Sequence, residues 1–344
     1  MTPEISEERG FDSRPRHALF FGINYKSLNF LDITIRFYED SKVAACWKIE
    51  QMKKKLLCIT IVLLIAVTVS GTGCTSNTSG ARVQVAGSTT IQPHAEALAK
   101  AFQTNNSSVT VFVQGGGSSA GVTAVGTGTA DIGMSSANLT ASQLARYPNL
   151  KPVPIAVDGL AVIINPQNPV NSLTLNQVRD IFSGSISNWN QVGGPNQQIN
   201  IVNREIGSGT RDGIQKIVLK NGSFSSRGIT QSSTGAVRSF VAADPNAIGY
   251  ISFAEVDNSV KALGIDGVVP TYASIANGTY PIQRDLLFVT NGDPSGYAKA
   301  FLDFTLSPAG QAILKANKEV SINDVSVNRL AKTSVTAKTT TSDR

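Results

Sequence analysis

Apolar and polar positions alternate along most of the chain as short strands followed by amphipathic helices. Runs rich in Val and Ile, such as residues 82–87 ("RVQVAG") and 109–114 ("VTVFVQ"), predict strands. The apolar positions that share one face of the helix predicted between them are Ile91, Ala95, Leu98 and Phe102. This alternation of elements predicts an α/β protein.

The later part of the chain continues the pattern. Residues 153–166 read as a long β-rich run broken by the turn dipeptide Asp158-Gly159, and residues 174–177 form a capping box that predicts a helix ending near Phe182. Further strands are predicted at 198–205, 247–253, 260–265 and 286–290. The last helix is predicted to begin at Ser307-Pro308, because Pro favours the first position of a helix. The tail, residues 326–344, is polar.

The N-terminal region has the pattern of an export signal. Residues 52–55 are positively charged, and residues 56–69 form an apolar run shorter than the about 20 residues needed to span a bilayer. Small residues then lead to Cys74, as in a lipoprotein cleavage box, although the usual leucine three residues earlier is Gly71. Residues 52–73 are therefore predicted to be a signal peptide and Cys74 a lipid attachment site. The alternative is a membrane anchor that is never cleaved.

Two flanking segments follow from this assignment. A signal peptide begins close to the initiator residue, so we expect translation to start at Met52 and residues 1–51 to be a mis-annotated extension. Residues 74–81 are polar and small, which is typical of a tether between an anchor and a folded domain.

Composition excludes several classes of function. The 344 residues carry a net charge of +6 and no Lys/Arg-rich run with interleaved aromatics, so nucleic acid is not an expected partner. All three cysteines (Cys46, Cys58 and Cys74) precede the main body, and the chain has only two histidines. A disulfide framework, a cysteine metal site and a histidine-rich metal site are thus excluded there, and no cofactor is expected.

Three strand-to-helix junctions share one chemistry. Residues 86–90 ("AGSTT"), 115–121 ("GGGSSAG") and 207–213 ("GSGTRDG") each combine glycines and hydroxyls at the predicted start of a helix. Free backbone N–H groups and the helix dipole favour an anion at such a position. If the fold brings the three junctions together, they form an anion site. Arg204 and Arg211 add guanidinium groups that can bind an oxyanion through two hydrogen bonds. This donor set favours a small tetrahedral oxyanion of the phosphate or sulfate class.

The junctions and their neighbouring segments resemble the phosphate-binding proteins that supply ABC-type phosphate importers. The similar segments occur in the family's order and cover roughly residues 82 to 320: "VAGSTTIQPHAEALAKAF", "VQGGGSSAGV", "ADIGMSSA", "IAVDGLAVIINPQNPV", "LTLNQVRDIFSGSISNW", "VNREIGSGTRD", "DPNAIGYIS" and "LSPAGQAIL".

The resemblance implies a periplasmic-binding-protein-like (type II) fold with two lobes and a ligand cleft between them. Residues 82–156 and 258–325 would form the first lobe, and residues 157–257 the second. It also implies a monomeric, non-enzymatic receptor outside the cytoplasm that passes phosphate to membrane permease subunits.

The family's phosphate contacts transfer to definite positions of this chain. These are Ser88, Thr89, Thr90, Ser118, Arg204, Ser208, Gly209 and Thr210. Many relatives have a carboxylate at the position of Ser136, where it accepts the proton of phosphate and disfavours sulfate. Here Asp158 is either a substitute acceptor or only the shaper of its turn. Arg211 is assigned either to the site or to an ion pair with a neighbour such as Asp212 or Glu205.

Other motifs are incomplete. Residues 117–121 match the G-x-S-x-G elbow of hydrolases, but no histidine follows them, and His94 is expected to be structural. Residues 207–213 approach a dinucleotide fingerprint, but the third glycine is one residue late. The functional alternatives are a binding protein for another oxyanion, such as sulfate or arsenate, and an extracytoplasmic phosphatase or phosphate-sequestering protein.

Overall fold

The computed structural model describes residues 80–325 of the chain. The predictions for residues 1–51, the signal peptide 52–73, the lipid site Cys74, nearly all of the tether and the tail 326–344 lie outside the described residues. Within the described range, no helix combines the length and hydropathy that a membrane crossing requires.

Strands and helices alternate as the sequence pattern predicts, so the α/β architecture is confirmed. The strands are β1 (Ala81–Gly87), β2 (Val109–Gly115), β3 (Ile132–Ser135), β4 (Leu150–Ile164), β5 (Ser172–Leu173), β6 (Asn200–Arg204), β7 (Ile229–Gln231), β8 (Ala247–Ser252), β9 (Lys261–Ala262), β10 (Gly264–Ile265), β11 (Gln283–Asn291) and β12 (Val320–Ser321). The α-helices are α2 (Gln92–Asn105), α3 (Ser118–Gly126), α4 (Ala141–Arg146), α5 (Leu175–Ser183), α6 (Gly209–Ile217), α7 (Thr234–Ala243), α8 (Tyr272–Ala276), α9 (Gly296–Leu306) and α10 (Pro308–Ala316).

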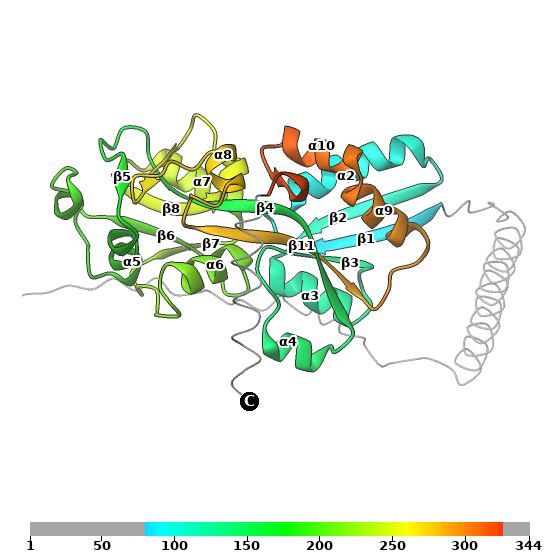
Figure 1. Cartoon of the computed structure of the whole chain (residues 1–344). Helices are drawn as coiled ribbons and strands as arrows, with labels where there is room; N and C mark the ends of the chain where they lie inside the picture. The colour runs from blue at the N-terminus through cyan, green and yellow to red at the C-terminus, as the bar shows by residue number, and fades with distance from the viewer. Residues whose placement is uncertain (1–79, 326–344) are drawn as a thin grey trace, which may run out of the picture. The chain divides into compact units, whose positions relative to one another are not determined.

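Two groups of parallel strands are joined by two long antiparallel strands. The order along the main sheet is β2-β1-β3-β11-β4-β8-β6-β7, in which β1 is parallel to β2 and β3, and β6 is parallel to β7 and β8. Strands β4 and β11 are antiparallel to each other and lie between the two groups, where Figure 1 shows them crossing from one side to the other. We call the β1–β3 side the first half and the β6–β8 side the second half.

Each half has its own hydrophobic core. In the first half, α2, α9 and α10 bury residues such as Leu98, Phe301 and Leu314 against the sheet. In the second half, α5 and α6 bury residues such as Phe182 and Ile214. The predicted face of α2 is confirmed, since Ile91, Ala95, Leu98 and Phe102 are all buried.

Strand β4 corrects one expectation. The predicted break at Asp158-Gly159 does not occur, and the strand runs through it for 15 residues. Gly159 serves close packing here, because a Cβ atom at this position would lie 2.6 Å from Cδ1 of Ile275. The dipeptide therefore marks the passage between the two halves and not a turn.

On the sequence alone, residues from 258 onward are assigned to the first lobe, but residues 258–282 pack in the second half. Leu263, Ile265, Ile275 and Tyr280 belong to the same core as Phe182, in the second half. The chain returns to the first half only along β11, after residue 283. The second half thus extends over about residues 158–282.

Candidate oxyanion-binding site

Four strand-to-helix junctions meet between the two halves. In the first half, β1 leads to α2 and β2 leads to α3; in the second half, β6 leads to α6 and β7 leads to α7. Each of the pairs β1/β2 and β6/β7 is parallel, so the carboxyl ends of both pairs lead into helix N-termini. Helix N-termini present unsatisfied backbone N–H groups and the positive end of the helix dipole. The sequence predicted three of these four junctions.

Hydroxyl groups from the junctions form one buried cluster. In the first half, Oγ of Ser88 donates a hydrogen bond to Oγ of Ser136 at 3.0 Å, and Oγ of Ser118 lies 3.3 Å from the same atom. Across the cleft, Oγ1 of Thr90 lies 3.0 Å from Oγ1 of Thr210 and 3.1 Å from Oγ1 of Thr234. Because a hydroxyl can donate or accept, this cluster can adapt its hydrogen bonds to an anion.

Arg204 is the first cation at the cluster. Its side chain is 2% exposed, although it lies at the end of β6. Its guanidinium donates to Oγ1 of Thr234 at 3.0 Å and to Oγ1 of Thr89 at 3.2 Å, so it contacts both halves. Two further N–H groups bind both carboxylate oxygens of Glu205 at 2.7 Å each. This bidentate pairing fixes the plane of the guanidinium.

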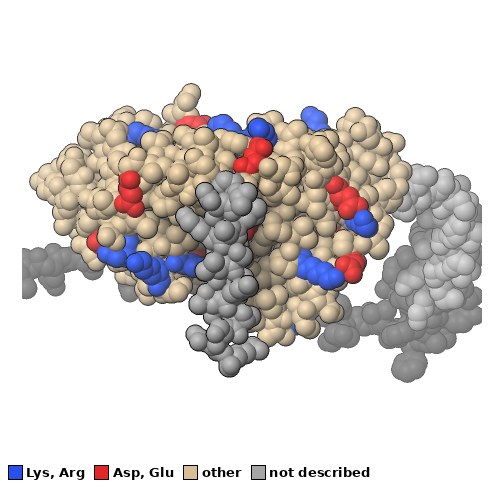
Figure 2. All heavy atoms as spheres, viewed as in Figure 1, with Lys and Arg blue, Asp and Glu red and all other residues tan. Residues whose placement is uncertain are grey.

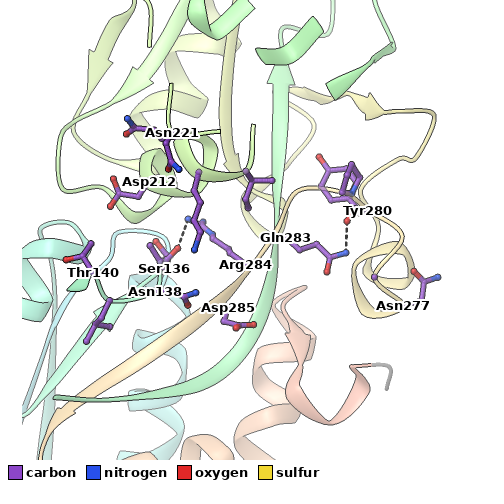
Figure 3. Close-up of a pocket in the computed structure, with 18 residues that line it drawn as sticks. Ser136, Asn138, Thr140, Asp212, Asn221, Asn277, Tyr280, Gln283, Arg284 and Asp285 are labelled. Carbon is purple, nitrogen blue, oxygen red and sulfur yellow. Dashed lines mark hydrogen bonds between the residues drawn. The ribbon is translucent and has the colours of Figure 1, made fainter. Parts of the chain in front are cut away.

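Arg284, at the start of β11, is a second buried cation that the sequence analysis did not identify. Its guanidinium donates to Oγ1 of Thr210 at 3.0 Å and to the carbonyl oxygen of Ser136 at 3.1 Å. Figure 3 shows it between the halves, with its hydrogen bond to Ser136 dashed. A cavity of about 650 Å³ lies beside Ser136 and Arg284 and extends along α6. Arg284 therefore lies where the hydroxyl cluster meets this cavity.

Glycines allow the two halves to approach closely. Gly117 and Gly207 have φ values of +93° and +91°, which disfavour other residues, and the carbonyl oxygen of Gly207 accepts a hydrogen bond from the N–H of Ser119 at 3.0 Å. A Cβ atom on Gly209 would lie 2.5 Å from Oγ of Ser118. The loop before α6 thus rests directly on the start of α3.

Two residues near this loop have local roles. Ser208 is the N-cap of α6, where its hydroxyl accepts a hydrogen bond from the N–H of Arg211. Arg211 donates to the carbonyl oxygen of Arg204 at 3.0 Å, and its guanidinium stacks over the ring of Phe224 at 4.2 Å. Arg211 thus supports the loop through a carbonyl oxygen and an aromatic ring; these contacts are neither a place in the hydroxyl cluster nor the expected ion pair with Asp212 or Glu205.

Asp158 faces Arg284 and not the hydroxyl cluster. Its Oδ2 atom accepts from Nε and from a terminal nitrogen of Arg284 at 2.9 and 2.7 Å. Its Oδ1 atom accepts from Oγ of Ser252 at 2.8 Å and from the N–H of Phe253 at 3.3 Å. Both oxygens are thus occupied, so Asp158 is placed to hold Arg284 and not to accept a proton from a ligand.

The structure brings together most of the predicted site residues. Those in the cluster or in contact with it are Ser88, Thr89, Thr90, Ser118, Ser136, Arg204, Gly209 and Thr210. Ser208 supports the site by capping α6, and Asp158 supports it by holding the guanidinium of Arg284. The residues missed are Thr234, Glu205 as partner of Arg204, and Arg284. Thr234 could have been found, because residues 232–235 ("SSTG") repeat the hydroxyl-and-glycine signal of the other junctions.

Among residues 80–325, no group of three or more His, Cys, Asp or Glu side chains is arranged to hold a metal ion. On the face drawn in Figure 2, charged side chains are few and spread over a largely uncharged surface.

Asp158, Glu255 and His94 are buried titratable groups that lie close to one another. Burial, together with Glu319, raises the pKa of Asp158 to about 6 despite Arg284, and burial raises the pKa of Glu255 to about 7. Burial alone would lower the pKa of His94, but the carboxylates of Glu319, Glu255 and Asp158 together raise it. From about pH 4 up to these raised pKa values, the three groups therefore hold more protons in the native state than in the unfolded state.

This excess of protons predicts how stability depends on pH. Because stability falls with pH wherever the native state binds more protons, we expect the free energy of unfolding to decrease as the pH rises from about 4 to about 7. Urea unfolding at a series of pH values measures this slope. Glu255→Gln should flatten it, whereas Asp324→Asn, at an exposed carboxylate with a lowered pKa, should leave it unchanged. Stability that rises over this range would contradict the prediction.

Comparison with known proteins agrees with the site. Residues 72–309 match the model of the PBP superfamily domain. The chain is 35% identical over 247 residues to the phosphate-binding protein PstS of Bacillus subtilis, covering 71% of this chain and 82% of that protein. It is 30% identical to PstS of Borreliella burgdorferi, covering 68% of this chain and 87% of that protein.

Solved structures give the same assignment. A putative phosphate ABC transporter substrate-binding protein from Clostridium perfringens, with bound phosphate, is 39% identical with a TM-score of 0.68, covering 70% of this chain and 99% of that one. An ABC-type phosphate transport receptor from Vibrio cholerae is 31% identical with a TM-score of 0.60, covering 70% of this chain and all of that one. The chain therefore belongs to the PBP superfamily and, within it, to the family of two-lobed phosphate-binding proteins.

Proposed function

We propose that this chain is an extracytoplasmic solute-binding protein that captures inorganic phosphate and delivers it to the permease of an ABC importer. The observation that carries the proposal is the convergence of hydroxyls from four helix N-termini with the guanidiniums of Arg204 and Arg284. A tetrahedral oxyanion with several acceptor oxygens matches such a donor set. As a member of its family, the chain is a transport receptor and not an enzyme.

Binding is conformational and involves no chemical step. Each half supplies two helix N-termini, and Arg204 contacts Thr234 in its own half and Thr89 in the other. An anion that binds both halves at once stabilises their closed arrangement, because it contacts both sets of donors only there. The closed form then docks on the permease.

The N-terminal region would keep this receptor at the outer face of the membrane. We assign residues 52–73 to a signal peptide and Cys74 to lipid attachment, with a monomeric domain tethered to the anchor. Mass spectrometry of the protein from membranes tests the lipid attachment, and mass spectrometry of the unprocessed precursor tests the start at Met52. A processed chain that begins at lipid-modified Cys74 is expected, and peptides from residues 1–51 would refute a start at Met52.

A competition titration tests the proposed ligand. Phosphate should bind the purified protein and be displaced by arsenate, which has the same shape and protonation, more readily than by sulfate. If the protein binds sulfate more tightly than phosphate, phosphate is not its ligand and the alternative of another oxyanion is correct. Turnover of a phosphomonoester would instead favour a phosphatase.

Ser136 provides a test of selectivity. Its hydroxyl is buried in the cluster between Ser88 and Ser118. In Ser136→Asp, a carboxylate could accept the proton of phosphate but would repel fully deprotonated sulfate. We therefore expect the ratio of phosphate to sulfate affinity to rise by at least about tenfold. The matched control is Ser136→Asn, which has the same size without the charge; an equal rise in Ser136→Asn would argue against a charge effect.

A further inference from the structure

Behind Arg284, a continuous chain of buried polar contacts leads away from the hydroxyl cluster. Arg284 binds Asp158 at 2.7 Å, and the hydroxyl of Ser252 donates its one proton to Asp158 at 2.8 Å. Oε1 of Glu319 lies 3.4 Å from the same hydroxyl oxygen. Oε1 of Glu319 lies 2.9 Å from Nε2 of His94. The charged members of this chain are nearly inaccessible to solvent, with exposed fractions from 1% for Asp158 and Glu319 to 7% for Arg284. We call these five residues the buried relay.

The buried relay lies where the polypeptide passes between the two halves. Arg284 and Asp158 are directly opposite each other in the register of β11 and β4. Ser252 ends β8 in the second half, and Glu319 precedes β12, which pairs with β4. His94 is on the first turn of α2, the helix that follows Thr89 and Thr90. The buried relay therefore contacts both crossing strands and the start of a site helix.

The charges in this region are not balanced by one another. The titratable and charged groups that face each other here are Asp158, Glu255, Glu319, His94, Arg284, Arg238 and Tyr280. Three carboxylates thus share the region with two guanidiniums, and the Arg238 guanidinium also binds the carboxylate of Asp257 at 3.3 Å. Both ring nitrogens of His94 and Oε1 of Glu255 are buried without a hydrogen-bond partner, so the contact of Nε2 with Glu319 at 2.9 Å is an ion-pair contact. Such groups are well placed to gain or lose a proton when a nearby charge changes.

We propose that Arg284 is a second anion-contacting residue of the cleft and that the buried relay behind it takes up a proton when the anion binds. This inference rests on the proposed function, since it requires an oxyanion in the cleft. An anion beside Thr210 and Arg284 partly neutralises the guanidinium charge that otherwise stabilises the Asp158 carboxylate. The carboxylates of the region then face a larger excess of negative charge, which favours their protonated forms and charged His94.

The direction of the effect follows from the pKa values. Those of Asp158 and Glu255, about 6 and 7, and the raised pKa of His94 place protonation of the region near neutral pH. A further negative charge raises each of these pKa values. Proton uptake should therefore be measurable near neutral pH and should disappear at alkaline pH, where the region stays deprotonated.

Isothermal titration calorimetry with inorganic phosphate tests the proposal. The binding heat is measured at one pH in buffers that differ in ionisation enthalpy, and its dependence on that enthalpy gives the number of protons exchanged. The wild type is compared with Arg284→Gln, His94→Gln and Glu319→Gln. The matched control is Asp324→Asn, which removes an exposed carboxylate five residues from Glu319. Phosphate's own ionisation is the same in every titration, so differences between variants isolate the protein.

Each outcome has a defined meaning. We expect His94→Gln and Glu319→Gln to bind phosphate with clearly reduced proton uptake, and Asp324→Asn to match the wild type. Arg284→Gln should lose both affinity and most of the uptake. Uptake that is unchanged in His94→Gln and Glu319→Gln would overturn the inference while leaving phosphate binding intact. Absence of any phosphate binding by the wild type would instead refute the proposed function itself.

Discussion

Replacing Arg204 with Ala should nearly abolish phosphate binding. The guanidinium is buried and contacts Thr89 and Thr234 in opposite halves. Its removal also leaves the carboxylate of Glu205 without its cation. Truncating one partner of a buried, hydrogen-bonded charge pair costs about 2–5 kcal/mol, which corresponds to roughly 30- to several-thousand-fold in Kd. Isothermal titration with phosphate measures the loss.

Two variants make this result specific. Arg204→Lys keeps the charge but cannot bind both oxygens of Glu205 and the two threonines in one plane, so an intermediate affinity is expected. Arg179→Ala removes a half-exposed arginine of the second half, paired with its neighbour Asp180, and should bind phosphate normally. Wild-type affinity in Arg204→Ala would remove Arg204 from the site.

Gly209→Ala should weaken phosphate binding without destabilising the free protein. The added Cβ would lie 2.5 Å from Oγ of Ser118 and 2.7 Å from Oγ of Ser136, both in the opposite half. Overpacking of this kind costs about 1–3 kcal/mol, or roughly 5- to 150-fold in affinity. Because Gly209 begins α6, alanine is compatible with its helical backbone, so the thermal midpoint without phosphate should not fall.

Small-angle X-ray scattering shows whether the cause is incomplete closure. With saturating phosphate, Gly209→Ala should keep a larger radius of gyration than the wild type. The matched control is Gly235→Ala at the start of α7, where a Cβ atom would meet nothing within 4 Å. Full compaction of Gly209→Ala at normal affinity would show that contact between the halves does not depend on this glycine.

The site could be predicted from sequence where its signals are local. Ser88, Ser118 and Thr210 occur in junctions whose apolar strand, glycines and hydroxyls are adjacent in the chain. The same signal around Thr234 was missed because β7, which precedes it, has only three residues and is largely exposed. Without an apolar run, nothing in the local pattern indicated a strand there.

Other features depend on contacts between distant segments. Arg284 resembles an ordinary surface charge in the sequence, and only the register of β11 against β4 places it beside Asp158. Asp158-Gly159 has the composition of a turn, but pairing on both sides and packing against Ile275 keep the strand extended. Residues 258–282 carry no local mark of the half against which they pack.

The division of the site into two junctions per half has a consequence for release. Neither half holds a complete set of donors, so each alone is a weak anion binder, and high affinity arises from the effective concentration of one half-site relative to the other. A membrane partner that separates the halves by a few ångströms would thus convert a tight complex into a weak one without touching the anion. The energy required to unload the anion then includes the cost of opening the halves about β4 and β11 and the loss of the contacts made by one half, and no competing ligand has to enter the cleft.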